Sequence, residues 1–170
     1  MGSVPVMHVF TTGEVVTASN LNNNTVTLAA FVLSVPYCKV RQTSNQPIGT
    51  GTALSWSTAD KNTDSIWSAG QPTRLTGNTP GWYELSGKFE CITSITTGRR
   101  GTIPAVNGTQ LNQMLLPGAQ SSAGICPDFP IFLNATDYAE LLAFSDVASS
   151  STNSGTAIAQ AWALLRWASQ

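Results

Sequence analysis

Histidine and cysteine supply many of the nucleophiles, bases and metal ligands of enzymes, and both are scarce in this sequence. His8 is the only histidine, and the cysteines are Cys38, Cys91 and Cys126. A catalytic triad or dyad would have to recruit His8 from outside the expected core, and these scattered residues do not provide the neighbouring ligands that zinc needs. The odd number of cysteines and their spacing do not indicate a disulfide framework. We therefore expect buried free thiols in a reducing compartment.

Carboxylate pairs are the remaining candidates for enzyme chemistry. Three pairs lie close in the sequence: Glu84 with Glu90, Asp137 with Glu140, and Asp60 with Asp64. Glu84 and Glu90 share one face of a predicted strand, but their separation along the chain is too large for the carboxylate spacing of about 5 Å found in a retaining glycosidase. A calcium site at Asp60 and Asp64 would need more oxygen ligands than the sequence shows. We interpret these residues as solvated charges and expect a protein that is not an enzyme and has no cofactor or metal.

The composition restricts the class of protein further. The chain has 170 residues, 8 Lys and Arg, 9 Asp and Glu and a net charge of −1, and only 10% of its residues are charged. A nucleic-acid-binding domain needs a basic surplus, yet Arg99-Arg100 is the only basic pair. A coiled coil or helical bundle would need more Glu, Lys and Ala, and 5 Trp, 6 Phe and 3 Tyr argue against disorder. The abundance of Ser, Thr, Asn, Gly and Pro favours a single, mostly β domain with many turns.

Residues 1–34 differ from the rest of the chain and are predicted to form an N-terminal arm. Thr17 can cap a helix on whose face Leu21, Leu28 and Val32 would lie together. The run Asn22–Thr25 contains poor helix formers, so we expect the helix to be short or broken. Its narrow apolar stripe indicates either an attachment device or a helix folded over one end of the main domain.

The targeting signals of the arm are weak. The N-terminus lacks the basic start and apolar run of a signal peptide, and the longest apolar stretch, residues 28–35, is interrupted by Ser34. We therefore expect no membrane contact and a protein that is made and folded in a cytoplasm.

Residues 35–170 carry the pattern of strands. Over Trp82–Ile92, a core-facing set that includes Tyr83, Leu85 and Cys91 alternates with polar residues. Asn107-Gly108 is a strong hairpin motif, and the polar segment 57–71 is predicted to be an exposed loop. We count about eight strands with short turns, which predicts an antiparallel jelly-roll sandwich.

The C-terminal segment 157–169 is ambiguous between helix and strand. As a strand it would direct Ala163, Leu165 and Trp167 to one side and Trp162 and Leu164 to the other. Since only one face of a sheet in a two-layer sandwich meets the core, the second apolar face would need a partner, and the simplest partner is another copy of the chain.

Three strand patterns resemble those of a known superfamily. Pro80–Gly87 resembles the "G-x-Y-x-(aliphatic)-x-G" strand of the tumour-necrosis-factor and complement-globular-head jelly roll. Leu133–Leu141 is similar to its "L-x-x-G-D-x-V-x-L" strand, with Thr136 where glycine is usual, and Trp162–Leu165 is similar to its closing strand. This resemblance spans residues 35–170. It implies a homotrimer and favours a strand for residues 157–169.

A second resemblance concerns the source of the protein. Thr12–Asn22, Thr97–Gly101 and Val106–Thr109 are similar to structural proteins of tailed bacteriophages that infect actinobacteria, which carry the same jelly roll as a trimer on the particle surface. It implies a virion structural protein, made in the host bacterial cytoplasm and displayed on the virion surface. We expect a homotrimeric capsid decoration protein, a minor capsid or head-stabilising protein, whose arm docks on the phage major capsid protein.

The alternative is a tail-associated adhesin, a minor tail protein that binds a host surface glycan or protein. It would use Trp67 and the loop 57–71, and Trp56, Trp67 and Trp82 could together line a sugar-binding shelf. On the first hypothesis the interaction residues fall into two groups. The trimer contact is predicted at Trp162, Leu164 and Trp167, and the attachment arm is predicted to use Val15, Leu21, Leu28 and Val32.

Overall fold

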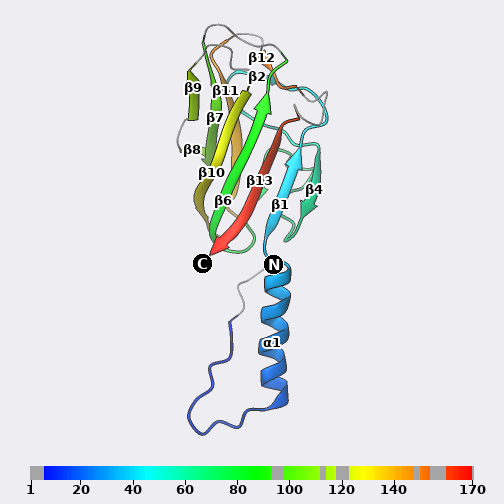
Figure 1. The fold of residues 1–170 in the computed structure, drawn as a ribbon, viewed down its shortest axis with the longest axis vertical. Helices are drawn as coiled ribbons and strands as arrows, with labels where there is room; N and C mark the ends of the chain where they lie inside the picture. The colour runs from blue at the N-terminus through cyan, green and yellow to red at the C-terminus, as the bar shows by residue number, and fades with distance from the viewer. Residues whose placement is uncertain are drawn as a thin grey trace.

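The structure is a computed structural model that describes residues 6–92, 98–111, 114–117, 123–147, 150–153 and 160–169. These residues form an antiparallel β-sandwich from one end of which a single helix projects (Figure 1). The predicted all-β jelly-roll architecture is confirmed. The described strands number 13 rather than about eight, because four of them are segments of only two residues.

One layer, which we call the front sheet, has five strands in the order β10-β6-β13-β1-β4. The first and last strands of the domain, β1 and β13, pair with each other, so the C-terminal segment closes the sheet beside the segment that opens it. The bounds are β1 Tyr37–Arg41, β4 Thr58–Asn62, β6 Gly81–Glu90, β10 Ala123–Leu133 and β13 Trp162–Ser169.

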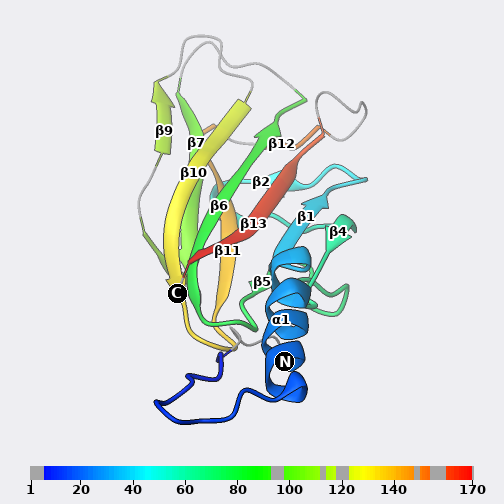
Figure 2. The same cartoon turned by 60° about the horizontal axis from the view of Figure 1, so that its bottom comes forward.

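The other layer, the back sheet, has six strands: β3-β11-β7-β8, with β5 added to β11 and β9 added to β7. Figure 2 shows β11 and β7 lying behind β6 and β10. The bounds are β3 Thr50–Ala53, β5 Leu75–Thr76, β7 Arg99–Val106, β8 Thr109–Gln110, β9 Met114–Pro117 and β11 Tyr138–Ser145; a small separate sheet joins β2 Pro47–Ile48 to β12 Ser150–Ser151.

The core between the sheets is built by period-two strands. In β6, the inward set Tyr83, Leu85 and Phe89 is fully buried, as its alternation predicts. Leu165 of β13 and Leu141 of β11 pack into the same cluster. Burial of these side chains supplies the main favourable term for folding.

The three cysteines lie in this core as free thiols, as predicted. Burial raises the pKa of Cys38 and of Cys126 to about 12, so neither thiol ionises near neutral pH.

The hairpin prediction at Asn107-Gly108 is confirmed. Asn107 and Gly108 both have positive φ, 50° and 78°, as a two-residue type I′ turn between β7 and β8 requires.

The C-terminal ambiguity is resolved in favour of a strand from Trp162 onward. Both neighbours of β13, which are β1 and β6, satisfy its backbone groups. Residues 157–159, the start of the predicted segment, lie outside the described residues.

The prediction of a short or broken helix is wrong. Helix α1 runs without interruption over 16 residues, Ala18–Leu33, and includes the asparagine run. Thr17 caps it by accepting a hydrogen bond from the backbone N–H of Asn20 at 3.2 Å, and the helix stops before Pro36. The propensity cost of each asparagine is only a few tenths of a kcal/mol, roughly, which a satisfied cap offsets.

The prediction of an exposed loop over residues 57–71 is also wrong in part. Thr58–Asn62 forms β4, which pairs with β1 at the margin of the front sheet. Charged residues such as Asp60 and Lys61 hide the strand pattern, yet they suit an edge strand because they discourage pairing with other chains. Ile66, in the same segment, is 1% exposed and belongs to the core.

Candidate interaction surfaces

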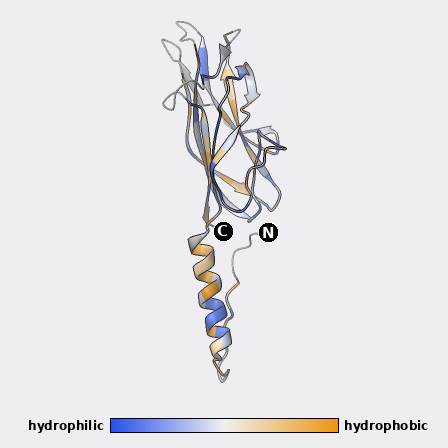
Figure 3. Cartoon of the chain, turned by 90° about the vertical axis from the view of Figure 1, so that its right-hand side faces the viewer, coloured by the Kyte–Doolittle hydropathy of each residue, from blue (hydrophilic) through white to orange (hydrophobic). Residues whose placement is uncertain are grey.

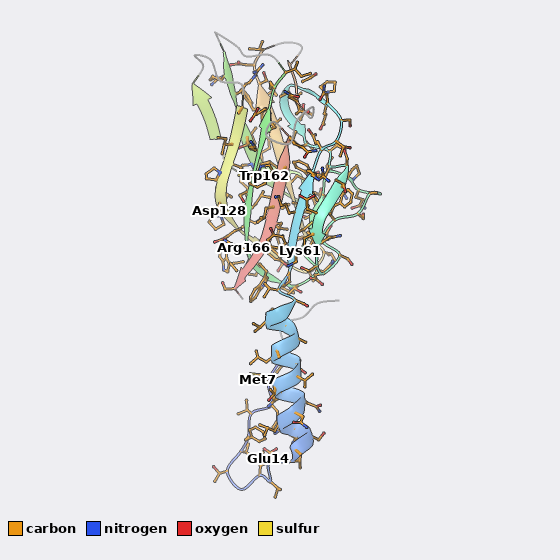
Figure 4. All side chains as sticks on the ribbon, turned by 45° about the vertical axis from the view of Figure 1, so that its right-hand side comes forward. Met7, Glu14, Lys61, Asp128, Trp162 and Arg166 are labelled. Atoms are coloured by element: carbon orange, nitrogen blue, oxygen red, sulfur yellow. The ribbon has the colours of Figure 1, made fainter. Side chains whose placement is uncertain are left out.

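The outer face of the front sheet, which points away from the core, gathers much of the charge of a charge-poor chain. Five of the 8 Lys and Arg residues project from its strands: Lys39, Arg41, Lys61, Lys88 and Arg166. Figure 4 shows Lys61 of β4, Asp128 of β10, and Trp162 and Arg166 of β13 on this face. Only three of the eight cationic side chains, Arg74, Arg99 and Arg100, therefore lie elsewhere in the molecule.

Carboxylates pair with most of these cations. Arg166 Nε donates to Glu84 Oε2 at 3.0 Å, Arg41 Nε donates to Asp60 Oδ1 at 2.7 Å, and Lys88 Nζ lies 3.3 Å from Glu90 Oε1. The hydrogen bond that Arg166 donates to Glu84 raises the pKa of Arg166. Glu84 and Glu90, considered above as an enzyme pair, are thus each occupied by a different cation.

The second predicted pair, Asp137 and Glu140, is also engaged in structural contacts. Asp137 accepts from the side chain of Asn107 at 2.8 Å, and Glu140 accepts from the Thr73 hydroxyl at 2.8 Å. No group of three or more His, Cys, Asp or Glu residues within the described ranges could hold a metal ion.

The predicted trimer-contact residues divide between two surroundings. Trp162 and Leu164 lie half-buried on the outer face, where the Lys39 ammonium is 5.9 Å from the Trp162 ring. Trp167 instead packs against the core, donates from Nε1 to the Pro80 carbonyl at 3.3 Å and meets the Phe31 ring edge-to-face. Trp167 therefore anchors the base of α1 to the sandwich within one chain.

A second apolar surface lies at the β10 edge of the front sheet. Trp82 and Phe132 face each other across β6 and β10 with ring centroids 5.6 Å apart, and each remains 45% exposed. Together with Leu111 and Phe129 they line a groove of about 490 Å³, which we call the edge groove. A pair of half-exposed aromatic rings beside a groove is the kind of surface that proteins use for association.

The edge groove is protected against strand addition. β10 is the outermost strand of its sheet, so one side of its backbone has no partner strand within the described structure. It contains Pro127 and Pro130, which lack the N–H that an added strand would need. A partner at this edge is therefore expected to bind mainly through side chains.

In the sequence, Trp82 was a candidate only as part of a sugar-binding shelf, and Phe132 was not a candidate. The structure does not form that shelf. Trp56 is 2% exposed and lies in the core, and Trp67 is half-buried with its Nε1 donating to the Pro72 carbonyl at 3.2 Å. The outward set of β6, which begins at Trp82, could have drawn attention to its cross-strand neighbour Phe132.

The predicted attachment residues are all exposed. Val15 is 78% exposed, and Leu21, Leu28 and Val32 on α1 are 52%, 42% and 63% exposed. The helix extends away from the sandwich rather than folding over its end (Figure 1). Among the described helical residues, none is part of a helix long and apolar enough to cross a membrane.

The segment before α1 doubles back along the helix as a hook. Gly13, at φ 86°, turns the chain, and Glu14 closes the turn by accepting from the Thr11 backbone N–H at 3.0 Å and from His8 at 2.5 Å. These hydrogen bonds lower the pKa of Glu14. Asn24 of α1 holds the hook by two hydrogen bonds to the backbone of His8. His8, the only histidine, thus has a structural role far from the sandwich.

The sandwich shares its fold with solved structures. The globular domain of the zebrafish complement 1qA protein aligns with a TM-score of 0.57 over 78% of this chain and 96% of that domain, at 9% identity. The Eiger TNF of S. frugiperda aligns with a TM-score of 0.55 over 81% of this chain and 95% of its own, at 11% identity. The chain has the C1q/TNF jelly-roll fold. No protein-family profile matches the sequence, and neither does any curated protein.

The tyrosine and the two glycines of the β6 strand motif each have a packing role in this chain. Tyr83 is fully buried and its hydroxyl donates to the Thr79 carbonyl at 2.6 Å, which ties the strand to the preceding turn. A Cβ at Gly81 would lie 2.4 Å from the Ser169 carbonyl, and one at Gly87 would lie 2.6 Å from the Trp162 carbonyl. Both glycines therefore allow β13 to approach β6, and the resemblance to the jelly-roll motif is confirmed at the level of the fold.

Proposed function

We propose that this protein is a homotrimeric, non-enzymatic structural protein of a virion surface. The jelly roll forms the head of each subunit, and the arm of residues 1–34 attaches it to the particle. The observation that carries this proposal is the presence of two separate apolar surfaces on the head, beside a helix whose apolar side chains are exposed.

The ion pair of Glu84 and Arg166 lies between the two head surfaces along β6 and β13. The edge groove presents Trp82 and Phe132 at the margin of the front sheet, whereas Trp162 and Leu164 lie on the outer face over β13. Contact between unlike surfaces of identical subunits is heterologous, and it forms a ring when the rotation closes. We place the edge groove of one subunit against the Trp162 face of the next, which satisfies both surfaces in a closed trimer.

Light scattering after size-exclusion chromatography tests the trimer. The wild-type chain is expected at three times its monomer mass at micromolar concentration, whereas Phe132→Glu and Trp162→Glu are each expected to dissociate. Loss of a central aromatic contact costs about 2 kcal/mol, or roughly a thirtyfold weaker contact. Ile92→Glu is the matched control, because Ile92 is 54% exposed and lies in neither surface.

Mixing the two variants tests the heterologous geometry. The intact groove of W162E can still bind the intact outer face of F132E, so an equal mixture is expected to form heterodimers while each variant alone stays monomeric. A wild-type monomer would overturn the trimer. A mixture that stays monomeric would overturn the groove-to-face arrangement while leaving the trimer in place.

The attachment role rests on the arm and on the phage-like sequence phrases. The exposed apolar side chains of the arm suit a docking segment, and the small net charge suits dense packing of copies on a shell. Trimers match the three-fold positions of an icosahedral capsid, where copies that bridge neighbouring subunits would strengthen the shell.

Quantitative mass spectrometry of purified particles tests the location. Copies are counted relative to the major capsid protein. Hundreds of copies per particle are expected for a capsid decoration protein, since the head alone offers so many equivalent sites. A handful of copies would replace this role by that of a tail-associated adhesin, and absence from particles would overturn the virion proposal.

A further inference from the structure

Helix α1 presents an apolar stripe that its own chain covers only in part. None of its 16 residues is charged, and Leu21, Leu28 and Val32 are all more than 40% exposed. An isolated helix of this length is only marginally stable in water, and an apolar exposed stripe calls for a partner. The contact between Phe31 and Trp167 fixes the base of the helix but leaves the stripe open.

The stripe has the spacing of a helix-to-helix seam. Its positions alternate in steps of three and four residues, which is the a and d pattern of a coiled coil. Thr25, the polar member, donates its hydroxyl to the Leu21 carbonyl at 2.9 Å, so it needs no partner from outside the helix. We define the seam by five residues: Ala18, Leu21, Thr25, Leu28 and Val32.

The seam faces an apolar cavity of about 530 Å³ between α1 and the hook. Met7 and Phe10 form its outer wall, and Leu21, Leu28 and Val32 form its helical wall. The wall is apolar, so a side chain from another helix is a better occupant than water.

The distribution of apolar residues along α1 identifies the occupant. The six residues nearest the sandwich, Leu28–Leu33, are all apolar, whereas the far half of the helix contains the asparagine run (Figure 3). A particle surface bound at the tip of the arm would favour the opposite order. Copies of the same helix would be closest to one another where they leave a trimeric head. Their contacts therefore require apolar residues at that end of α1, as observed. Because the helix is uncharged, identical copies do not repel one another.

We propose that three copies of α1 pack through this seam into a short helical stalk beneath the head. This inference rests on the trimer proposed above. A seam of only two heptads is too short to set the number of chains, so the head sets it. Leu21, Leu28 and Val32 then contact other copies of the chain, and docking on the particle is left to the hook, residues 6–16, with its exposed Val9, Val15 and Val16.

Cysteine cross-linking of the full chain tests the stalk. Leu28→Cys places a thiol in the seam, and Val26→Cys places one on another face of the same helix, where Val26 is 66% exposed. Seam thiols of neighbouring helices lie within disulfide reach, so oxidation of L28C is expected to shift the monomer band to a dimer on a non-reducing gel. V26C and wild type, whose native thiols are buried, are expected to stay monomeric on the gel.

The outcomes separate this inference from the trimer itself. Light scattering first establishes the mass of each variant, and L21C repeats the seam test at a second position. A trimeric L28C that does not cross-link, or one that cross-links no faster than V26C, would overturn the stalk while leaving the trimeric head intact. A monomeric wild-type chain would overturn both.

Discussion

Thr136 shows how one residue can keep a turn that its side chain disfavours. It lies in the turn between β10 and β11 with φ 77°, a left-handed conformation that glycine adopts freely and that a β-branched residue rarely adopts. Hydrogen bonds on either side hold it there: the Thr136 N–H donates to the Gly77 carbonyl at 2.8 Å, and the Asp137 N–H donates to the Asn134 carbonyl at 3.1 Å. The jelly-roll motif has glycine at this place, and this chain keeps the geometry without it.

Replacing Thr136 by glycine is expected to stabilise the protein. Glycine relieves the left-handed strain of the folded state, but it also increases the conformational entropy of the unfolded state. The first effect should be the larger, so the free energy of unfolding should increase by about 1 kcal/mol. Urea denaturation measures this difference. Ala135→Gly is the control, because Ala135 has no positive φ and its substitution should destabilise. A destabilised T136G would show that the threonine side chain makes a contact worth more than the strain.

The same turn makes stability sensitive to acid. Asp137 accepts hydrogen bonds from Asn107 Nδ2 at 2.8 Å and from the Asn134 backbone N–H at 2.9 Å, and these lower its pKa below the usual 3.8. Because the folded pKa is the lower one, the stabilisation is present above the unfolded value and is lost as the pH falls through the folded value. The urea midpoint should therefore decrease below about pH 4. Asp137→Asn should decrease less steeply in that range, and an unchanged slope would contradict the assignment.

At the scale of single elements, β6 shows the closest agreement between pattern and structure. Its alternation predicted which side chains are buried, and its two glycines mark the closest approach of β13. A local pattern suffices here because the core covers one face of the strand and leaves the other partly open. The edge strand β4 shows the reverse, since its charged residues gave no pattern and only pairing with β1 defines it.

Gly87→Ala tests the packing of β6 directly. The added methyl group would lie 2.6 Å from the Trp162 carbonyl and 2.7 Å from Leu141 Cδ2, so neighbouring strands must shift. Overpacking of this kind is expected to destabilise by about 1–3 kcal/mol, read from the denaturation midpoint. Gly70→Ala, where an added Cβ meets nothing within 4 Å, should leave stability nearly unchanged. Equal effects of the two substitutions would refute this account of the motif glycine.

Helix α1 is longer than the sequence pattern predicted. Composition argued against a helical bundle for the whole chain, but a seam of two heptads is too short to affect overall composition. The asparagines lie in the half of α1 away from the sandwich, where the hook contacts Asn24. Local helix propensity does not include that contact, so propensity alone predicted a helix that is too short.

At the scale of the whole molecule, charge and apolar surface are unevenly distributed. The cations gather on the outer face of the front sheet, where carboxylates neutralise most of them, while exposed apolar residues collect at the β10 edge and on the arm. Such a distribution favours an oligomer over a monomer.

Thermal unfolding should depend on protein concentration if the head is a trimer. Dissociation accompanies unfolding, so mass action raises the melting temperature as the chain concentration increases. A dilution series followed by circular dichroism measures this dependence. F132E, expected to be monomeric, should melt at one temperature throughout the series. A wild-type melting temperature that does not change with concentration would contradict a reversible trimer.

Local patterns in the sequence were enough to predict the class of the fold, the buried face of β6 with Cys91, and the hairpin at Asn107-Gly108. Each of these depends on residues that are neighbours in the chain, where period-two patterns and turn chemistry act. Long-range packing places Trp167 inward against Phe31, leaves Trp56 and Trp67 without a shelf, and brings Trp82 to Phe132 beside a groove. These contacts join residues far apart in the sequence, and only the packing of one strand against another brings them together.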